Sequence, residues 1–330
     1  MKNLVLMCKS YIDDLHRLKL LKNSIDKFNA DKLPFYICVP KVDFEIMRNE
    51  IVTGNEDYEI KFFTDEQVIA STNQPTNQPT NQPTNQPTNQ PTSLCGNNLT
   101  QTWLSQQLIK LYFFKLGLCK FYVCLDSDCY YINNFYEKDY MYNDSTPYTL
   151  LKKKYIDSSN DENFKIKEYF KRDGVLYSFG GCCSVFSSEV LKSFESALLE
   201  NSLTFFDLIT LVPWEFQWYG EYVINKKPYE IVLNDGNLKV ISYQKEYNEL
   251  RKIYTLKNLR DKGYKAICMQ AGWVKEIEYK HSPFIRFYRA IEKFKFALYE
   301  RNMEKKLNKR IENYCKSLIR APIREFLREV

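Results

Sequence analysis

The first part of the chain alternates between short apolar runs and amphipathic stretches. Runs at 3–8, 34–40 and 58–63 have the length and the β-branched and aromatic content of buried strands. Between them, residues 15–28 repeat apolar side chains at helical spacing, and 41–52 indicates a shorter helix. This strand–helix–strand–helix–strand order predicts an α/β domain with a mostly parallel sheet.

The pattern resumes further along the chain. Residues 136–172 are polar, and we expect exposed loops and one short helix there. The other expected elements are helices at 101–118, 188–199 and 211–223, a strand at 121–125, an apolar stretch with two glycines at 175–186, and short strands at 229–232, 238–242 and 265–270. The turn signal Asn234-Asp235-Gly236 predicts that the strands at 229–232 and 238–242 form a hairpin.

One segment interrupts the pattern. From Thr72 to Pro91 the tetrapeptide TNQP occurs five times without variation, and Thr92 begins a sixth copy. A proline at every fourth position removes backbone donors, and no apolar residue is present to join a core. We expect 72–92 to be a solvated low-complexity insertion.

The strand at 121–125 ends on Asp126-Ser127-Asp128. Two carboxylates beside apolar neighbours are costly unless a cation meets them, and Mg²⁺ or Mn²⁺ with waters and a diphosphate would serve. The alternative is an aspartate-rich turn that caps the next backbone segment. Ligands of parallel α/β sheets bind beyond the carboxyl ends of strands, and Lys9-Ser10 lies at another such end.

The segment KFYVCLDSDCYYINNF resembles the strand-then-DxD motif of sugar-nucleotide-dependent glycosyltransferases with the GT-A fold, most closely those of bacterial surface-polysaccharide loci. The resemblance extends in order over about 1–281. It implies a GT-A-like (Rossmann-like) mixed, mostly parallel sheet flanked by helices. It also implies Mn²⁺ or Mg²⁺ on the two aspartates, a nucleotide-diphosphate sugar as donor (a UDP-sugar above all) and a glycan or lipid-linked acceptor.

Candidate donor-binding residues come from four places in the sequence. They are Cys8, Lys9, Ser10, Gln106, Lys110, Asp126, Ser127, Asp128, Gly180 and Gly181. Gln106 and Lys110 stand on the helix before the acidic motif, and their alternative is that helix's solvent face. Gly180-Gly181 would form a backbone wall against the sugar or a simple turn between strands. His281 would close the metal site, as late histidines do in many GT-A enzymes, or cap a helix at the surface.

Glu215 is the first candidate for a catalytic base, with Glu221 second. Glu215 lies between Trp214 and Trp218 in the sequence, and apolar surroundings raise the pKa of a carboxyl group, as suits general acid–base work. Its charge would equally favour a helix N-terminus, and the aromatic stripe would equally be core. An inverting reaction needs such a base, and a retaining one does not need it there, so the stereochemistry stays open.

Composition adds the compartment and the domain organisation. The chain has no run of 18 apolar residues and only a short apolar stretch at its N-terminus, so we expect a cytoplasmic protein. Its 10 cysteines include no CxxC pair and have no histidine at zinc spacing, which predicts buried thiols and no structural zinc.

The last residues form a distinct basic segment. Residues 284–330 hold 13 Lys and Arg against 6 Asp and Glu, while the whole chain has a net charge of +6. The sequence therefore predicts a catalytic domain at 1–283 and an amphipathic helical tail at 284–330. The tail would bind the anionic inner surface of the plasma membrane or pack on the domain with a solvated basic face.

Other function classes fit less well. A metal-dependent nucleotidyl- or phosphotransferase could use paired aspartates, but it would show a glycine-rich phosphate loop early in the chain, and Cys8–Ser10 has none. A non-catalytic surface-associated binding protein is the third interpretation. Nucleic-acid binding is not expected, because the basic charge gathers in one tail and does not surround an aromatic platform.

Overall fold

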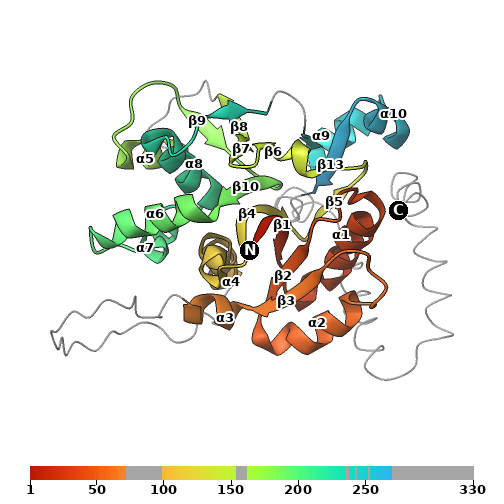
Figure 1. The fold of residues 1–330 in the computed structure, drawn as a ribbon. Coiled ribbons are helices and arrows are strands. Elements are labelled where there is room, and N and C mark those ends of the chain that lie inside the picture. The colour runs from red at the N-terminus through yellow and green to blue at the C-terminus, as the bar shows by residue number, and fades with distance from the viewer. Residues whose placement is uncertain (72–98, 154–161, 235–237, 242–243, 252, 270–330) are drawn as a thin grey trace.

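The computed structural model describes residues 1–71, 99–153, 162–234, 238–241, 244–251 and 253–269. Within them the chain is a mixed α/β structure around a five-stranded sheet of order β10-β4-β1-β2-β3, shown in Figure 1. The predicted mixed, mostly parallel sheet flanked by helices is confirmed. The TNQP repeat at 72–92, His281 and the tail at 284–330 lie outside the described residues.

Four strands of the central sheet are parallel. They are β1 (Lys2–Lys9), β2 (Phe35–Val39), β3 (Ile60–Thr64) and β4 (Cys119–Asp126), and only β10 (Ser184–Ser187) runs antiparallel, beside β4. Strands β1, β2 and β4 are buried almost throughout, because helices cover both faces of a parallel sheet. Since parallel strands end at one edge, the residues after β1, β2, β3 and β4 come close together there.

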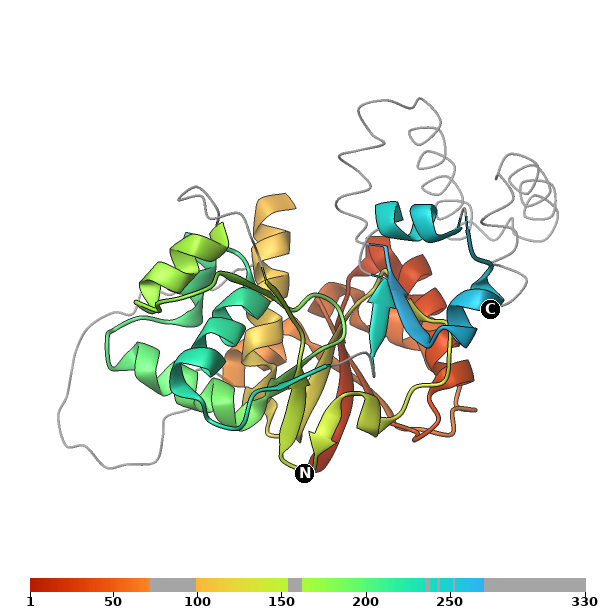
Figure 2. The same cartoon turned by 90° about the horizontal axis from the view of Figure 1, so that it is seen from above.

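Helices lie on both faces, as Figures 1 and 2 show. One face packs against α1 (Leu15–Phe28) and α2 (Phe44–Ile51). The other packs against α4 (Leu99–Tyr112), α6 (Ser188–Leu199), α7 (Phe205–Leu211) and α8 (Glu215–Lys226). The short α3 (Asp65–Ala70) follows β3 directly, and a capping box at Thr64 and Gln67 fixes its start.

The chain leaves the central sheet directly after the acidic motif. Strand β5 (Cys129–Tyr131) pairs antiparallel with β13 (Tyr264–Cys268), which pairs with β12 (Lys239–Ile241) in a separate three-stranded sheet. Helices α9 (Gln244–Arg251) and α10 (Leu256–Asp261) pack against this sheet. The Asp126–Asp128 turn is therefore held between two sheets.

Two expectations about the middle of the chain are wrong. The polar stretch 136–172 contains β6 (Met141–Asn143), β7 (Thr146–Thr149) and β8 (Leu151–Lys153) besides α5 (Glu162–Tyr169). The late strands form no hairpin, because β11 (Val232–Leu233) pairs with β7 and β12 pairs with β13. Strands of two to four residues carry too little periodicity to be recognised, and long-range pairing decides their partners.

The helix expected at 211–223 begins later than predicted. Helix α7, which the sequence analysis missed, ends at Leu211, Pro213 lies between the two helices, and α8 starts at Glu215. Trp218 and Tyr222 on α8 are buried, so the aromatic stripe is core. Strand β9 (Tyr177–Phe179) supplies the segment before Gly180, and the 3-10 turn Phe113–Leu116 extends α4. Among the described residues, no helix has both the length and the apolar character needed to span a bilayer.

Candidate active site at the carboxyl edge of the sheet

Hydrogen bonds to three other segments hold the acidic turn Asp126–Asp128 in place. The hydroxyl of Ser127, which is buried, donates to Oδ2 of Asp14 at 3.1 Å, and the Met269 N–H donates to the Asp128 carbonyl at 3.1 Å. The Asp126 N–H points at the Cys182 sulfur, 3.5 Å away. Both aspartate residues remain partly exposed at the edge of the sheet. The turn thus presents two carboxylates on a fixed backbone.

A buried lysine stands behind the turn. Lys110 Nζ lies 2.8 Å from Asp126 Oδ1 and 2.9 Å from Glu215 Oε1, and 5.0 Å from the centre of the Phe216 ring. The side chains of Lys110 and Glu215 are 3% and 4% exposed, and that of Asp126 is 24% exposed. The Tyr122 hydroxyl donates to the Lys110 carbonyl at 2.7 Å and ties α4 to β4. We call Lys110, Asp126 and Glu215 the charged triad.

The charged triad has two carboxylates for one ammonium group. Burial alone would lower the pKa of Lys110, but the charges of Asp126 and Glu215 outweigh it and hold this pKa well above its usual value. Burial raises the pKa of Asp126 and of Glu215, and the lysine opposes that rise without cancelling it. Lys110 is therefore held as a cation, and the charged triad has one carboxyl group more than it has ammonium groups.

The end of β1 carries a second buried ion pair. Lys9 lies beside Asp126 in the parallel register, and its Nζ is 2.9 Å from Asp65 Oδ2 and 2.7 Å from the Ser10 carbonyl. The Ser10 hydroxyl and Asp65 Oδ1 are buried without a hydrogen-bond partner in the described part of the chain. Burial also raises the pKa of Asp65. Two polar atoms at this edge therefore lack the partner that buried groups normally have.

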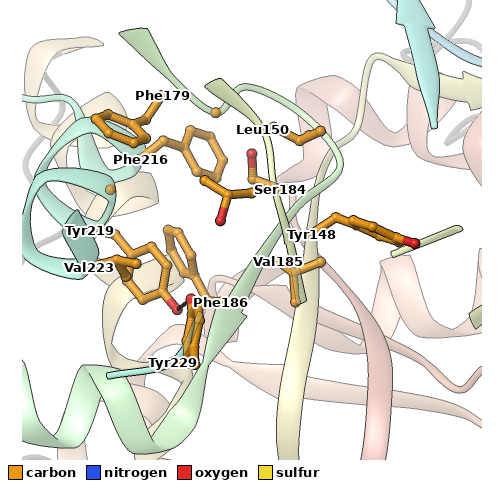
Figure 3. Close-up of a pocket in the computed structure, with 13 residues that line it drawn as sticks. Tyr148, Leu150, Phe179, Ser184, Val185, Phe186, Phe216, Tyr219, Val223 and Tyr229 are labelled. Atoms are coloured by element: carbon orange, nitrogen blue, oxygen red, sulfur yellow. Dashed lines mark hydrogen bonds between the residues drawn. The ribbon is translucent and has the colours of Figure 1, made fainter. Parts of the chain in front are cut away.

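The glycine turn adjoins the charged triad through Phe216. Gly180 has φ +72°, and a Cβ there would collide with the Phe216 side chain. Behind the turn lies a cavity of about 30 Å³ with aromatic walls, among them Phe179, Phe186, Tyr219 and Tyr229, shown in Figure 3. The Ser184 hydroxyl borders the cavity and has no partner among the described residues. Gly181, at φ +117°, faces open space.

The other predicted residues lie apart from this constellation. Glu221 is fully buried and paired with Arg172, whose Nη2 donates to Oε1 at 2.9 Å, so its carboxylate is already committed. Cys8 is buried inside β1, with its sulfur directed at the Lys9 carbonyl. Gln106 is half-buried on α4, one turn before Lys110. The charged neighbours of Glu215 are Lys110 and Asp126.

Sequence reasoning missed Asp65 and Asp14, and it placed Glu215 and Lys110 in separate roles. Asp65 follows β3 just as Lys9 ends β1 and Asp126 ends β4. Comparing the first charged residue after each apolar run would have found Asp65. No such signal exists for the pairing of Lys110 with Glu215, which are 105 positions apart.

Part of the chain matches a protein family, and the fold is similar to a solved structure. The model of a family of unknown function, DUF6492, matches residues 3–159, which is somewhat less than half of the chain. No curated protein matches the sequence. Among solved structures, the apo crystal structure of mouse xyloside xylosyltransferase 1 is similar at 9% identity, with 81% of this chain and 98% of that chain covered and a TM-score of 0.44.

Proposed function

We propose that the chain is a metal-dependent glycosyltransferase that takes its sugar from a nucleotide-diphosphate donor. The observation that carries this proposal is the acidic turn itself: two partly exposed carboxylates at the carboxyl end of β4, backed by a buried lysine and glutamate. Ligands of open α/β sheets bind at this edge. The resemblance of the 120–135 segment to the DxD motif points to the same chemistry.

The donor set of the turn suits a hard divalent ion. Carboxylate oxygens are the ligands that Mg²⁺ and Mn²⁺ prefer, and both commonly keep waters and substrate phosphates as further ligands. Lys110 contacts Oδ1 of Asp126, so Oδ2 of Asp126 and the Asp128 carboxylate would hold the ion. When bound, the ion would neutralise negative charge that gathers on the leaving diphosphate. His281 remains a proposed third ligand, and it lies outside the described residues.

The chain's own residues would bind and orient the donor. The Lys9 end of β1 lies next to Asp126, and the partnerless Ser10 hydroxyl and Asp65 Oδ1 offer hydrogen bonds to a polar ligand such as a nucleotide. A Cβ added at Gly181 would meet no atom within 4 Å, so the backbone there would face the sugar. Gln106 stays a weaker donor-binding candidate, one turn before Lys110 on α4.

Glu215 is the proposed base of an inverting reaction. Lys110 fixes its carboxylate, and burial raises its pKa, which brings proton transfer closer to neutral pH. Glu221 is not proposed for this role, because its carboxylate is buried against Arg172. If the reaction retains the anomeric configuration, the charged triad would instead stabilise charge at the reaction centre.

For the acceptor and the cellular location, only a general class is proposed. We propose a glycan or lipid-linked acceptor and a cytoplasmic protein attached at the membrane periphery through 284–330. The tail lies outside the described residues, so this part rests on its sequence alone. A phosphotransferase receives no support, since Ser10-Tyr11 follows β1 where a glycine-rich loop would be needed.

A donor screen tests the proposal. The chain is incubated with UDP-, GDP-, CDP- and dTDP-linked sugars, with Mn²⁺ or with EDTA, and release of nucleoside diphosphate is measured. We expect one donor class to be hydrolysed slowly with Mn²⁺ and not with EDTA. Asp126→Asn and Asp128→Asn should remove this activity, whereas the matched change Asp57→Asn, at an exposed ion pair with Lys32, should keep it. Hydrolysis that is independent of metal and of both aspartates would refute the proposal.

A further inference from the structure

Four buried cysteines gather behind the acidic turn. They come from three separate segments: Cys129 on β5, Cys182 and Cys183 before β10, and Cys268 on β13. All four residues are at most 5% exposed. Cys129 and Cys268 are directly paired across the two antiparallel strands, and the Cys182 sulfur lies within 4.8 Å of the sulfurs of Cys129, Cys183 and Cys268. We call these four residues the thiol cluster.

The sulfur separations match the geometry of a tetrahedral thiolate site. Cys129 Sγ lies 4.0 Å from Cys183 Sγ, and Cys183 Sγ lies 3.9 Å from Cys182 Sγ. Zinc–sulfur bonds of about 2.3 Å place the sulfurs of a tetrahedral site about 3.8 Å apart. The ligand atoms of Cys129, Cys182 and Cys183 all lie within 4.8 Å of one another. Little movement would be needed to accept an ion.

The backbone at Cys183 is held in an unusual conformation that produces this geometry. Successive side chains of an extended segment point to opposite sides, so neighbouring cysteines normally separate their sulfurs. Cys183 has φ +73°, a region that L residues rarely occupy, and the Cys182 and Cys183 sulfurs converge. Such strained conformations cluster at functional sites. Two independent features, the convergence of distant segments and the local backbone, therefore direct sulfurs to one point.

We propose that the thiol cluster binds one soft divalent cation of the zinc class, with Cys129, Cys182 and Cys183 as ligands and Cys268, whose sulfur lies within 4.8 Å of the Cys182 sulfur, as the fourth. Thiolates select zinc, whereas the carboxylates of Asp126 and Asp128 suit Mg²⁺ or Mn²⁺. Binding would release the thiol protons to solvent. The site would tie together the acidic turn, the glycine turn and β13, and it does not depend on the proposed sugar transfer.

This inference reverses the expectation of no structural zinc. That expectation rested on spacing along the chain, since none of the cysteines forms a CxxC pair. The fold supplies the proximity that the spacing lacks, because 53 positions separate Cys129 from Cys182 and 85 separate Cys183 from Cys268. Buried thiols packed as small apolar groups are the competing explanation, and they predict no bound metal.

Metal content tests the proposal directly. The full chain is produced in zinc-supplemented medium, gel-filtered in buffer with EDTA, and analysed by elemental mass spectrometry. We expect about one zinc per chain, held through the EDTA step as in structural thiolate sites. Cys129→Ser and Cys183→Ser should lower the zinc content at least tenfold. The matched changes Cys38→Ser and Cys119→Ser, at buried cysteines outside the thiol cluster, should leave it unchanged.

A spectroscopic measurement on the unaltered chain tests the proposal even if the cysteine variants fail to fold. Cobalt(II) added to zinc-free protein should give the near-ultraviolet thiolate-to-cobalt charge-transfer band, and added zinc should abolish it. Added Mg²⁺, which binds carboxylates and not thiolates, should leave the band unchanged, which separates this site from the proposed donor metal. Zinc at background level together with no charge-transfer band in the unaltered chain would overturn the proposal. Zinc retained by Cys129→Ser and Cys183→Ser would overturn it as well.

Discussion

At the scale of single residues, Lys110 decides the character of the candidate site. A lysine side chain only 3% exposed is rare unless it is paired, and here two carboxylates pair it. The lysine neutralises one of them and leaves a net negative site for a cation. Removing the lysine would leave two like charges close together in a site with little water, where charge is most costly.

Lys110→Met should therefore destabilise the fold by about 3–5 kcal/mol at pH 7, the typical cost of leaving buried charges unpaired. Without the lysine, the pKa values of Asp126 and Glu215 rise further above their usual range. Carboxyl groups whose folded-state pKa is raised bind protons on folding, so the variant should regain stability as the pH falls from about 7 to 5. Urea unfolding at both pH values measures this.

Two further variants control that experiment. Lys115→Met removes a lysine of the same length whose partner is Glu195 and whose side chain is 22% exposed, and it should cost about 1 kcal/mol or less. Lys110→Met combined with Glu215→Gln should recover part of the loss. An equal loss of unfolding free energy in Lys110→Met and Lys115→Met would show that the ion pairs of Lys110 stabilise the fold no more than a surface ion pair does.

The two glutamates of α8 should separate in their effects. Burial raises the pKa of Glu215, so a base at this position loses its proton-accepting form at a higher pH than an ordinary glutamate as the solution is acidified. We expect kcat/KM of the unaltered enzyme to fall on acidification through that raised pKa. Glu215→Gln should lower kcat at least about 100-fold and remove this acidic limb.

Glu221→Gln serves as the counterpart. Its carboxylate is fully buried against Arg172, so the change should cost stability on the order of 3 kcal/mol and leave the kcat of the folded fraction within about threefold. If the fall of kcat/KM on acidification persists in Glu215→Gln and disappears in Glu221→Gln, the catalytic base would be Glu221 and not Glu215.

At the scale of residues, the sequence shows which residues belong to the candidate site better than it shows which of them contact each other. The aspartates of the acidic turn are recognisable because they end an apolar run. The ion pair of Glu215 is not recognisable, because its partner Lys110 comes from α4, far away in the sequence. A partner more than a hundred positions away leaves no periodic signal.

At the scale of elements, the turn between β9 and β10 joins the candidate site to the core. Gly180 accepts the close approach of Phe216, and Phe216 in turn covers Lys110. The turn therefore requires glycine twice, once for its positive φ and once for the missing Cβ.

Gly180→Ala should consequently cost more than a positive φ alone. Gly174→Ala is the matched control, since Gly174 has φ +85° and no neighbour near the missing Cβ. The control should lose about 1–2 kcal/mol from backbone strain, and Gly180→Ala should lose a further ~1–3 kcal/mol from the collision with Phe216. Urea unfolding compares them. Equal losses would mean that Phe216 moves aside freely.

The long elements were predictable, and the short ones were not. β1, β2 and β4 are apolar along almost their full length, as helix-covered parallel strands must be, so their place in a parallel sheet follows from the sequence. β7 and β11 are only four and two residues long, and each is stabilised by a strand far away in the chain. A local turn signal at Asn234 could not show that its two flanking strands belong to different sheets.

At the scale of the whole molecule, the described residues form a central five-stranded sheet, with the candidate site at the carboxyl ends of its parallel strands, and three smaller sheets. Helices α3 and α4, which flank the TNQP repeat in the sequence, contact each other directly. The fold therefore does not need the repeat to bring them together.

Deleting 72–91 should leave folding and turnover almost unchanged. Shortening a loop from roughly 28 to 8 residues lowers the entropic free-energy cost of closing that loop by about 1 kcal/mol. The free energy of unfolding should therefore stay equal or rise slightly. Thermal unfolding and donor hydrolysis of the deleted chain measure this. A fall of many degrees in the melting temperature would show that the repeat stabilises the fold.

The central claim is that the acidic turn holds a divalent ion that binds the donor diphosphate. Calorimetric titration of the unaltered chain and of Asp128→Asn with UDP, with Mn²⁺ and with EDTA, tests it most directly. We predict that UDP binds the unaltered chain at least tenfold more tightly with Mn²⁺, a difference of about 1.4 kcal/mol, and that Asp128→Asn loses this gain while its melting temperature stays unchanged. Equal UDP affinity with and without Mn²⁺, or the full Mn²⁺ gain retained by Asp128→Asn, would contradict the account.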